Sequence, residues 1–394
     1  MRPLWLAPLL LLATFARGQA LDPRVAPPAI APVEWKTSEP ADGVIVLETS
    51  FPSPFTSGIE NNDTVPYRVF LPEGQGPFPF VLVIHYFGAT DLRAEVSLAT
   101  ELAKRGMAAG VLTLPYHLGR TPPRARSGEL AIRPDPAALR TTMFQASQDA
   151  RRAIDVAMQR PEVRQGEVGI FGTSLGAIVT ALVYAVDTRV TKVAFLLGGV
   201  DLAKIIWSSS RVVPQRDALR RRGFTEPKLR QELTVVEPLT YLPRTEPASA
   251  FIIQGRFDTV VPEASSDALI RAIPGAHVLK LETGHYGGIF VQRRLLRAVS
   301  DFFDKEFKGE PYVAPKRIYA PTLRLGISAD PLRGLDVGIG LDLFRLDKRG
   351  DAFGTAFLSP RGPSLFIGQR LGGGFSVGVV GSAKGASVGA FWST

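Results

Sequence analysis

A sharp turn between a strand-like and a helix-like segment is the feature that most restricts how this chain can fold. Residues 172–176 read Gly-Thr-Ser-Leu-Gly. They follow the apolar run 168–171, typical of a buried strand, and lead into the apolar helical segment 175–186. Glycines on both sides of Ser174 permit a turn too tight for larger side chains, which raises the serine hydroxyl above the sheet. Since the Leu175 amide at the helix N-terminus can stabilise a developing anion, the pattern predicts a nucleophilic serine.

Strand-like and helix-like segments alternate on both sides of this turn. Further apolar runs of strand length lie at 79–85, 107–115, 192–197, 248–254 and 277–281, and helical patterns lie at 92–105, 136–160, 264–273 and 289–307. This alternation predicts an α/β fold with a mostly parallel sheet flanked by helices. Residues 201–247 are too long for an ordinary connection, so we expect them to form a small lid.

Two further polar residues follow strands of this series. Asp258 lies in the segment 254–262, Gln-Gly-Arg-Phe-Asp-Thr-Val-Val-Pro, and His285 lies in 283–286, Thr-Gly-His-Tyr. Open α/β sheets assemble their sites at the carboxyl ends of strands. We therefore expect Asp258 and His285 to lie near Ser174.

The order serine, acid, histidine and these three local sequences resemble the α/β-hydrolase superfamily over residues 45–307. Within it, the sequence is most similar to the branch that contains dienelactone hydrolases and acetyl-ester hydrolases, although dienelactone hydrolases carry cysteine where Ser174 stands. The resemblance implies that Ser174 is the nucleophile, His285 the general base and Asp258 the acid that orients it. Some members place the acid after an earlier strand, where Asp201 lies; the whole loop around Asp258 favours Asp258.

A fourth segment, residues 85–88, reads His-Tyr-Phe-Gly and lies where the superfamily carries an H-G-x-G oxyanion loop. Tyr86 replaces the usual glycine. The resemblance implies an oxyanion hole formed by the amides of Leu175 and Phe87, with the amide of Tyr86 as the alternative, and a structural role for His85. We expect Tyr86 and His117 to contact substrate; a histidine bonded to backbone is the alternative for His117.

The resemblance implies a serine hydrolase that cleaves small-molecule carboxylic esters through an acyl-enzyme on Ser174, without a cofactor. A peptidase of the prolyl-oligopeptidase kind is the first alternative, although residues 21–66 are too few for the propeller of those enzymes. A non-catalytic surface-binding or assembly protein on a hydrolase scaffold is the second. No histidine and carboxylate cluster has metal-ligand spacing, so no metal is expected. The net charge of +9 forms no basic stripe, which argues against nucleic-acid binding.

Residues 1–20 have the pattern of a cleaved signal peptide: a positive start, an apolar run and the small-residue end Gly18-Gln19-Ala20. This pattern predicts a secreted or periplasmic protein, with a retained N-terminal anchor as the alternative.

Residues 309–394 hold 16 of the 38 glycines and show strict apolar alternation, as at 335–343. We place a boundary between a catalytic domain, 21–308, and this extension, and expect about six short strands in an antiparallel β-meander. Single-chain membrane barrels need about eight strands of roughly 9–11 residues, and several of these strands are shorter. A soluble meander packed on the catalytic domain or on a partner subunit is therefore favoured over outer-membrane association through residues 309–394.

Overall fold

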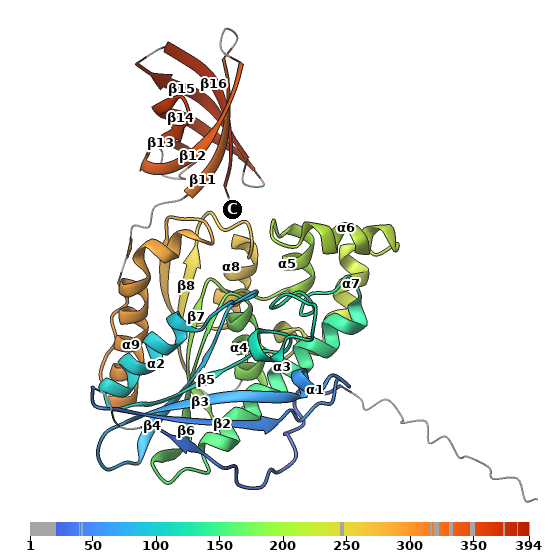
Figure 1. Ribbon diagram of the computed structural model, residues 1–394, viewed down its shortest axis with the longest axis vertical. Helices are drawn as coiled ribbons and strands as arrows, with labels where there is room; N and C mark the ends of the chain where they lie inside the picture. The colour runs from blue at the N-terminus through green and yellow to red at the C-terminus, as the bar shows by residue number, and fades with distance from the viewer. Residues whose placement is uncertain are drawn as a thin grey trace, which may run out of the picture.

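The computed structural model describes residues 21–38, 40, 42–244, 248–315, 317–318, 323–330, 334–346, 351–372, 375–383 and 385–393. The predicted signal peptide lies outside these residues. The chain forms a large α/β unit and a smaller C-terminal barrel (Figure 1). None of the helices in the described ranges is both long and apolar enough to cross a membrane.

The α/β unit is built on a sheet of ten strands in the order β1-β2-β3-β5-β4-β6-β7-β8-β9-β10. From β5 onward neighbouring strands are parallel, whereas β1, β2 and β3 pair in antiparallel fashion and β3 joins β5 antiparallel. The strands are Lys36–Thr37 (β1), Val44–Pro52 (β2), Thr64–Pro72 (β3), Phe78–Ile84 (β4), Ala108–Leu112 (β5), Val163–Thr173 (β6), Val190–Leu196 (β7), Ser249–Gly255 (β8), His277–Leu281 (β9) and Arg317–Ile318 (β10). The predicted fold class, an α/β-hydrolase fold, is confirmed.

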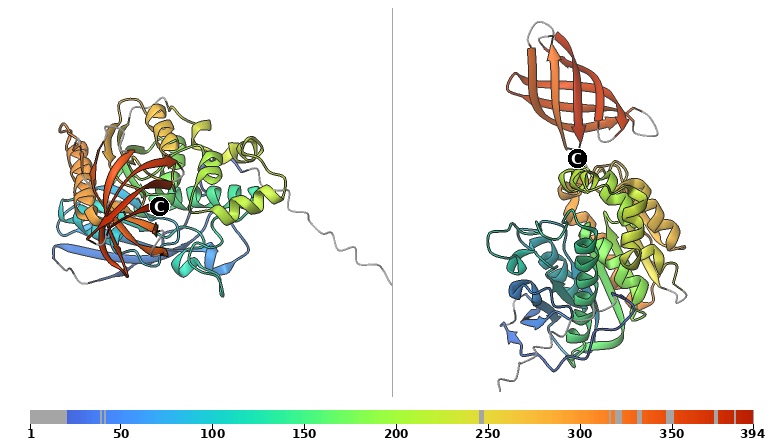
Figure 2. Two further views of the ribbon diagram at one scale, coloured as in Figure 1. Left: turned by 90° about the horizontal axis from the view of Figure 1, so that it is seen from above. Right: turned by 90° about the vertical axis from the view of Figure 1, so that its right-hand side faces the viewer.

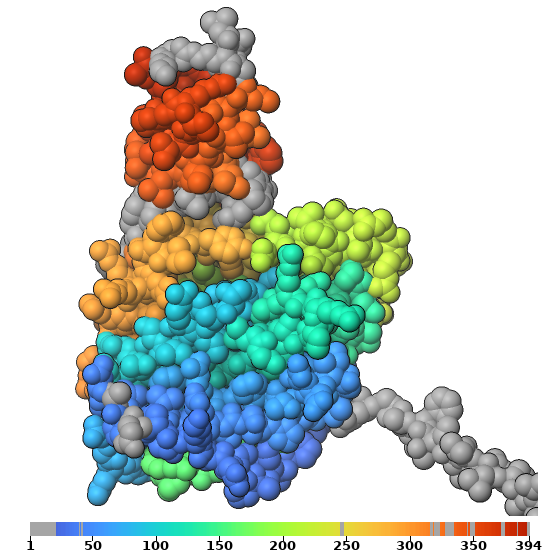
Figure 3. All heavy atoms as spheres, viewed as in Figure 1, coloured from blue at the N-terminus to red at the C-terminus, as the bar shows by residue number. Residues whose placement is uncertain are grey.

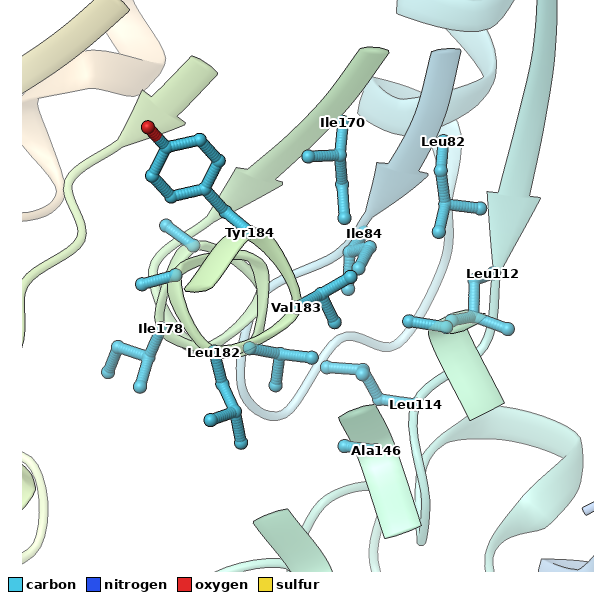
Figure 4. Packing of buried hydrophobic residues seen from close by; sticks show 14 of the residues in the cluster. Leu82, Ile84, Leu112, Leu114, Ala146, Ile170, Ile178, Leu182, Val183 and Tyr184 are labelled. Carbon is cyan, nitrogen blue, oxygen red and sulfur yellow. The ribbon is translucent and has the colours of Figure 1, made fainter. Parts of the chain in front are cut away.

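Helices cover both faces of this sheet. The helices α3 (Pro136–Ala157), α4 (Leu175–Val186) and α8 (Glu263–Ala272) contribute to the core on one face, and α2 (Arg93–Lys104) and α9 (Gln292–Lys308) to the core on the other. Figure 4 shows side chains of α4 beside those of the central strands, where Val183 lies close to Ile84. The strands that precede Ser174, Asp258 and His285 are thus covered by helices on both faces of the sheet.

Local sequence explains where α3 begins. Asp135 is its N-cap, and its carboxylate accepts a hydrogen bond from the Ala137 amide at 3.0 Å. Pro136 occupies the first helical position, where a missing amide hydrogen costs nothing. This capping fixes a 22-residue helix along the face of the sheet that carries α4.

The segment between β7 and β8 forms three short helices, α5 (Leu202–Ser208), α6 (Val213–Arg221) and α7 (Glu226–Leu233). They pack together beside α3, at one side of the α/β unit (Figure 1). These helices lie within the predicted lid, residues 201–247, and we refer to residues 202–233 as the lid segment.

The C-terminal strands are β11 (Leu323–Asp330), β12 (Gly334–Arg345), β13 (Ala352–Ser359), β14 (Gly362–Gly372), β15 (Phe375–Ser382) and β16 (Gly385–Ser393). The six predicted antiparallel strands are therefore present. They follow one another as the predicted antiparallel meander, and the meander closes into a barrel because β16 pairs back with β11 (Figure 2). The connecting residues 309–315 and 317–318 belong to the α/β unit: Tyr312 and Ile318 lie in its core, and β10 extends its sheet.

Candidate active site

The turn at residues 172–176 has the tight geometry that its sequence predicts. Ser174 joins β6 to α4 with φ 53° and ψ −112°, a conformation that side chains rarely adopt. A Cβ at Gly172 would lie 2.2 Å from the carbonyl oxygen of Gly176, and one at Gly176 would lie 2.4 Å from that of Ile84. Both flanking glycines are therefore required for the turn to fit beneath Ser174.

Three side chains from separate loops meet at this turn. The Oγ of Ser174 lies 2.9 Å from Nε2 of His285, and Nδ1 of His285 lies 2.6 Å from Oδ2 of Asp258. Ser174, Asp258 and His285 follow β6, β8 and β9, so their positions are fixed by the carboxyl ends of three parallel strands. With Nδ1–H donated to the carboxylate, Nε2 is free to accept the serine proton.

The second carboxylate oxygen of Asp258 is also held. Its Oδ1 accepts hydrogen bonds from the amides of Val260 and Val261, both at 2.8 Å. Asp201, the alternative acid, lies elsewhere: it caps α5 and pairs with Arg230 in the lid segment. The structure brings Asp258, and not Asp201, to the histidine.

His85 holds the loop after β4, which was predicted to form part of the oxyanion hole. This ring is fully buried; its Nδ1 donates to the carbonyl of Tyr86 at 2.8 Å and its Nε2 accepts from the Leu114 amide at 3.0 Å. Burial lowers the pKa of His85 to about 3, so the ring stays neutral and keeps this tautomer. Its expected structural role agrees with these contacts.

His117 holds the same loop, residues 85–88, in place through a second hydrogen bond. It is also fully buried, its Nδ1 donates to the carbonyl of Pro115 at 2.8 Å, and its Nε2 accepts from the amide of Gly88 at 3.0 Å. Burial lowers its pKa to about 4. The structure therefore does not bring His117 to the surface of the site, where a substrate contact was expected, but leaves it bonded to backbone.

The remaining predicted residues lie on the loop or at the turn. Tyr86 and Phe87 are partly exposed, and Leu175 begins α4 directly after Ser174. The Gly88 amide is occupied by His117, so the loop amides left to face a substrate are those before it. This arrangement is compatible with oxyanion donors at Leu175 and Phe87.

Tyr286 and Arg211, which were not predicted from the sequence, flank the site. The ring of Tyr286 lies edge-on to His285 with centroids 5.3 Å apart, and burial raises the pKa of its phenol. Arg211, from the lid segment, lies 5.6 Å from the centroid of the Phe87 ring. Only the adjacency of Tyr286 to His285 in sequence could have indicated the first, and no sequence signal pointed to Arg211.

An apolar cavity of about 70 Å³ lies between the first turn of α4, directly after Ser174, and the lid segment. Leu175 and Ile178 of α4 form one wall, and Leu202, Ile205 and Ile206 of α5 form another. Such a cavity suits a short hydrocarbon group. Among the described residues, no group of three or more histidines and carboxylates is placed to hold a metal ion.

The fold and the geometry of this site define the class of the α/β unit: it has the α/β-hydrolase fold. The structure is similar to that of an acetyl xylan esterase from Paenibacillus sp. R4, with 20% identity, a TM-score of 0.56 and coverage of 70% of this chain and 89% of that one. It is also similar to acetyl xylan esterase 1 from Thermoanaerobacterium sp. JW/SL YS485, with 17% identity, a TM-score of 0.50 and coverage of 68% and 88%. At these identities the likeness concerns the fold.

Sequence comparison gives one further relationship. The chain is 29% identical to Esterase EstD of Thermotoga maritima over 119 residues, which are 29% of this chain and 26% of EstD. The aligned stretch thus spans about a quarter of that relative. No family model matches the chain.

Proposed function

We propose that this protein is a serine hydrolase that cleaves carboxylic esters through an acyl-enzyme on Ser174. The observation that carries the proposal is the continuous hydrogen-bonded series from Ser174 through His285 to Asp258. This arrangement activates a hydroxyl that would otherwise be a weak nucleophile. The esterase name of the curated relative and the names of the two solved structures support an ester as the substrate.

In the proposed mechanism, His285 takes the proton of Ser174 as the hydroxyl attacks the acyl carbon, and Asp258 stabilises the resulting imidazolium. The amides of Leu175 and Phe87 stabilise the oxyanion. His285 then protonates the leaving alcohol, and water releases the acyl group by the same proton transfers in reverse. Tyr86 and Tyr286 border the substrate, and the apolar cavity beside Leu175 accepts a short acyl or alkyl group. No cofactor takes part.

A panel of substrates tests the reaction class. We expect the mature chain to hydrolyse p-nitrophenyl acetate and butyrate faster than long-chain esters, because the cavity is small. Aminoacyl anilides should be poor substrates. Faster hydrolysis of the anilides would favour the peptidase alternative, and absence of turnover on all substrates would favour a binding role. Fractionation of the native organism would test the proposed secreted or periplasmic location.

A further inference from the structure

The outer surface of the C-terminal barrel carries exposed apolar side chains on all six strands. Large apolar side chains there are exposed by 37–71%. They include Leu325 and Ile327 on β11, Leu335, Val337, Ile339, Leu341 and Leu343 on β12, Leu358 on β13, Leu365, Ile367 and Leu371 on β14, Phe375, Val377 and Val379 on β15, and Val388 on β16. Where side chains of the strands are described, no Asp, Glu, Lys or Arg points outward. We refer to this surface as the apolar belt.

Inside the barrel, one layer of side chains is charged and polar. Arg324 and Asp342 form an ion pair with Nε and Oδ1 2.7 Å apart, and their side chains are 0% and 3% exposed. Thr355 donates to Asp342 and Arg324 donates to Ser376 in the same layer. Phenylalanine rings fill the rest of the interior. A continuous apolar outer surface is the arrangement of barrels that stand in lipid, whereas a barrel in water carries polar side chains on its outer face.

The belt also closes on itself. Since β11 pairs with β16, the apolar side chains continue around the barrel, and no strand edge is left for another strand to join. Figure 3 shows the barrel standing clear of the α/β unit over most of its height. A folded partner covers one side of such a cylinder, whereas a bilayer surrounds it. The strands of 8–12 residues are close to the roughly 9–11 that a tilted strand needs to cross a bilayer.

The α/β unit exposes a second apolar surface, which is flanked by cationic side chains. The short helix η4 (Gly287–Val291) follows the site and exposes Ile289 by 69% and Phe290 by 52%. Exposed Arg293, Arg294 and Arg297 follow on the first turns of α9. Apolar side chains beside cationic ones are suited to the anionic headgroup region of a membrane.

The barrel and η4 both lie at the carboxyl ends of the strands of the large sheet. Arg370 of β14 lies 4.2 Å from the ring centroid of Phe257, the residue before Asp258, and η4 begins just after His285. We propose that the barrel is embedded in a lipid bilayer, with η4 against the anionic headgroups, so that the active site faces the membrane surface. This reverses the preference for a soluble extension, which rested on the number and the length of the predicted strands, because neither quantity reveals the closed apolar belt.

The absence of cysteine makes a direct test feasible. Six single-cysteine variants of the full chain place an environment-sensitive fluorophore on each strand: Ile327→Cys, Val337→Cys, Leu358→Cys, Ile367→Cys, Val377→Cys and Val388→Cys. Val25→Cys, 63% exposed on the α/β unit, is the matched control. Each variant is reconstituted from detergent into phosphatidylcholine–phosphatidylglycerol vesicles with plain or brominated acyl chains. Circular dichroism reports folding independently of esterase activity.

The proposal predicts loss of emission in brominated vesicles for all six barrel labels and not for Val25→Cys. Ile339→Arg should lower the vesicle-bound fraction about tenfold or more, and Val25→Arg should not. Labels that stay unquenched on a folded chain that does not float with vesicles would overturn the proposal. So would a discrete oligomer in detergent-free buffer with labels shielded on adjacent strands only, since a second copy would then cover the belt.

Discussion

Asp258 holds His285 through a hydrogen bond of 2.6 Å, and the other oxygen of the same carboxylate is fixed by two backbone amides. This fixes the imidazole tautomer, with Nε2 facing Ser174. In Asp258→Asn the amide group can donate to Nδ1, which leaves the proton on Nε2. We expect kcat for p-nitrophenyl acetate to fall about 10³- to 10⁴-fold with an unchanged circular dichroism spectrum.

Asp201→Asn is the matched control, because it changes the alternative acid in the same way. It should keep near-normal kcat and lose only part of its pairing with Arg230. A severe loss in Asp201→Asn together with normal turnover in Asp258→Asn would show that the acid is wrongly assigned.

His117 holds the loop after β4 through its hydrogen bond from the Gly88 amide, and we expect this loop to contribute to the oxyanion hole. His117→Ala leaves that amide without its acceptor, so we expect stability to fall by about 1–3 kcal/mol and kcat to fall more than KM changes. His117→Gln, which can restore an acceptor, should recover part of both. Urea unfolding and steady-state kinetics measure the two effects. A raised KM at normal kcat in both variants would instead indicate that the ring contacts substrate.

Glu95 should make stability depend on pH. Its side chain is 3% exposed, and burial raises its pKa from 4.5 to about 7. Between those values the folded state binds more protons than the unfolded state, so stability falls as pH rises through this window. Glu95→Gln removes this loss and should stabilise the protein at pH 8 by up to about 3 kcal/mol, with little effect at pH 4.

Urea unfolding at both pH values measures the effect of Glu95→Gln. The exposed Glu73→Gln is the control. An equal change in stability at pH 4 and pH 8 would mean that ionisation of Glu95 is not responsible.

The domain boundary predicted at Lys308 can be tested with two truncated chains. A chain that ends at Ile318 should keep the stability and Ser174 reactivity of the α/β unit, since every loop of the site lies upstream. A chain that ends at Lys308 loses Tyr312, packed between Phe251 and Phe302, and Ile318 from the core. It should still label at Ser174 but be about 2–5 kcal/mol less stable. Equal thermal stability of the two chains would place the boundary at Lys308.

The sequence predicted the elements whose signal is local. The bounds of α4, 175–186, agree with the helical pattern, because its cause, the glycine-flanked turn, is contiguous in sequence. The strand predicted at 168–171 is shorter than β6, Val163–Thr173, since its first half carries exposed polar residues that obscure the pattern.

Features that depend on distant residues were not predictable in the same way. Closure of the barrel rests on pairing between β11 and β16, whose residues Leu325 and Trp392 are 67 positions apart. The role of His117 depends on a backbone amide 29 residues away. No pattern in one sequence encodes such contacts, because they arise only when the elements are packed.

Covalent labelling of Ser174 tests the central claim most directly. A fluorophosphonate reacts with a serine only when a base and an oxyanion hole activate it. Intact-mass spectrometry of the full chain should show a single adduct, mapped to the peptide that contains Ser174. Ser174→Ala should show none, and His285→Ala should label far more slowly. An unmodified wild-type chain, or an adduct that persists in Ser174→Ala, would contradict the account.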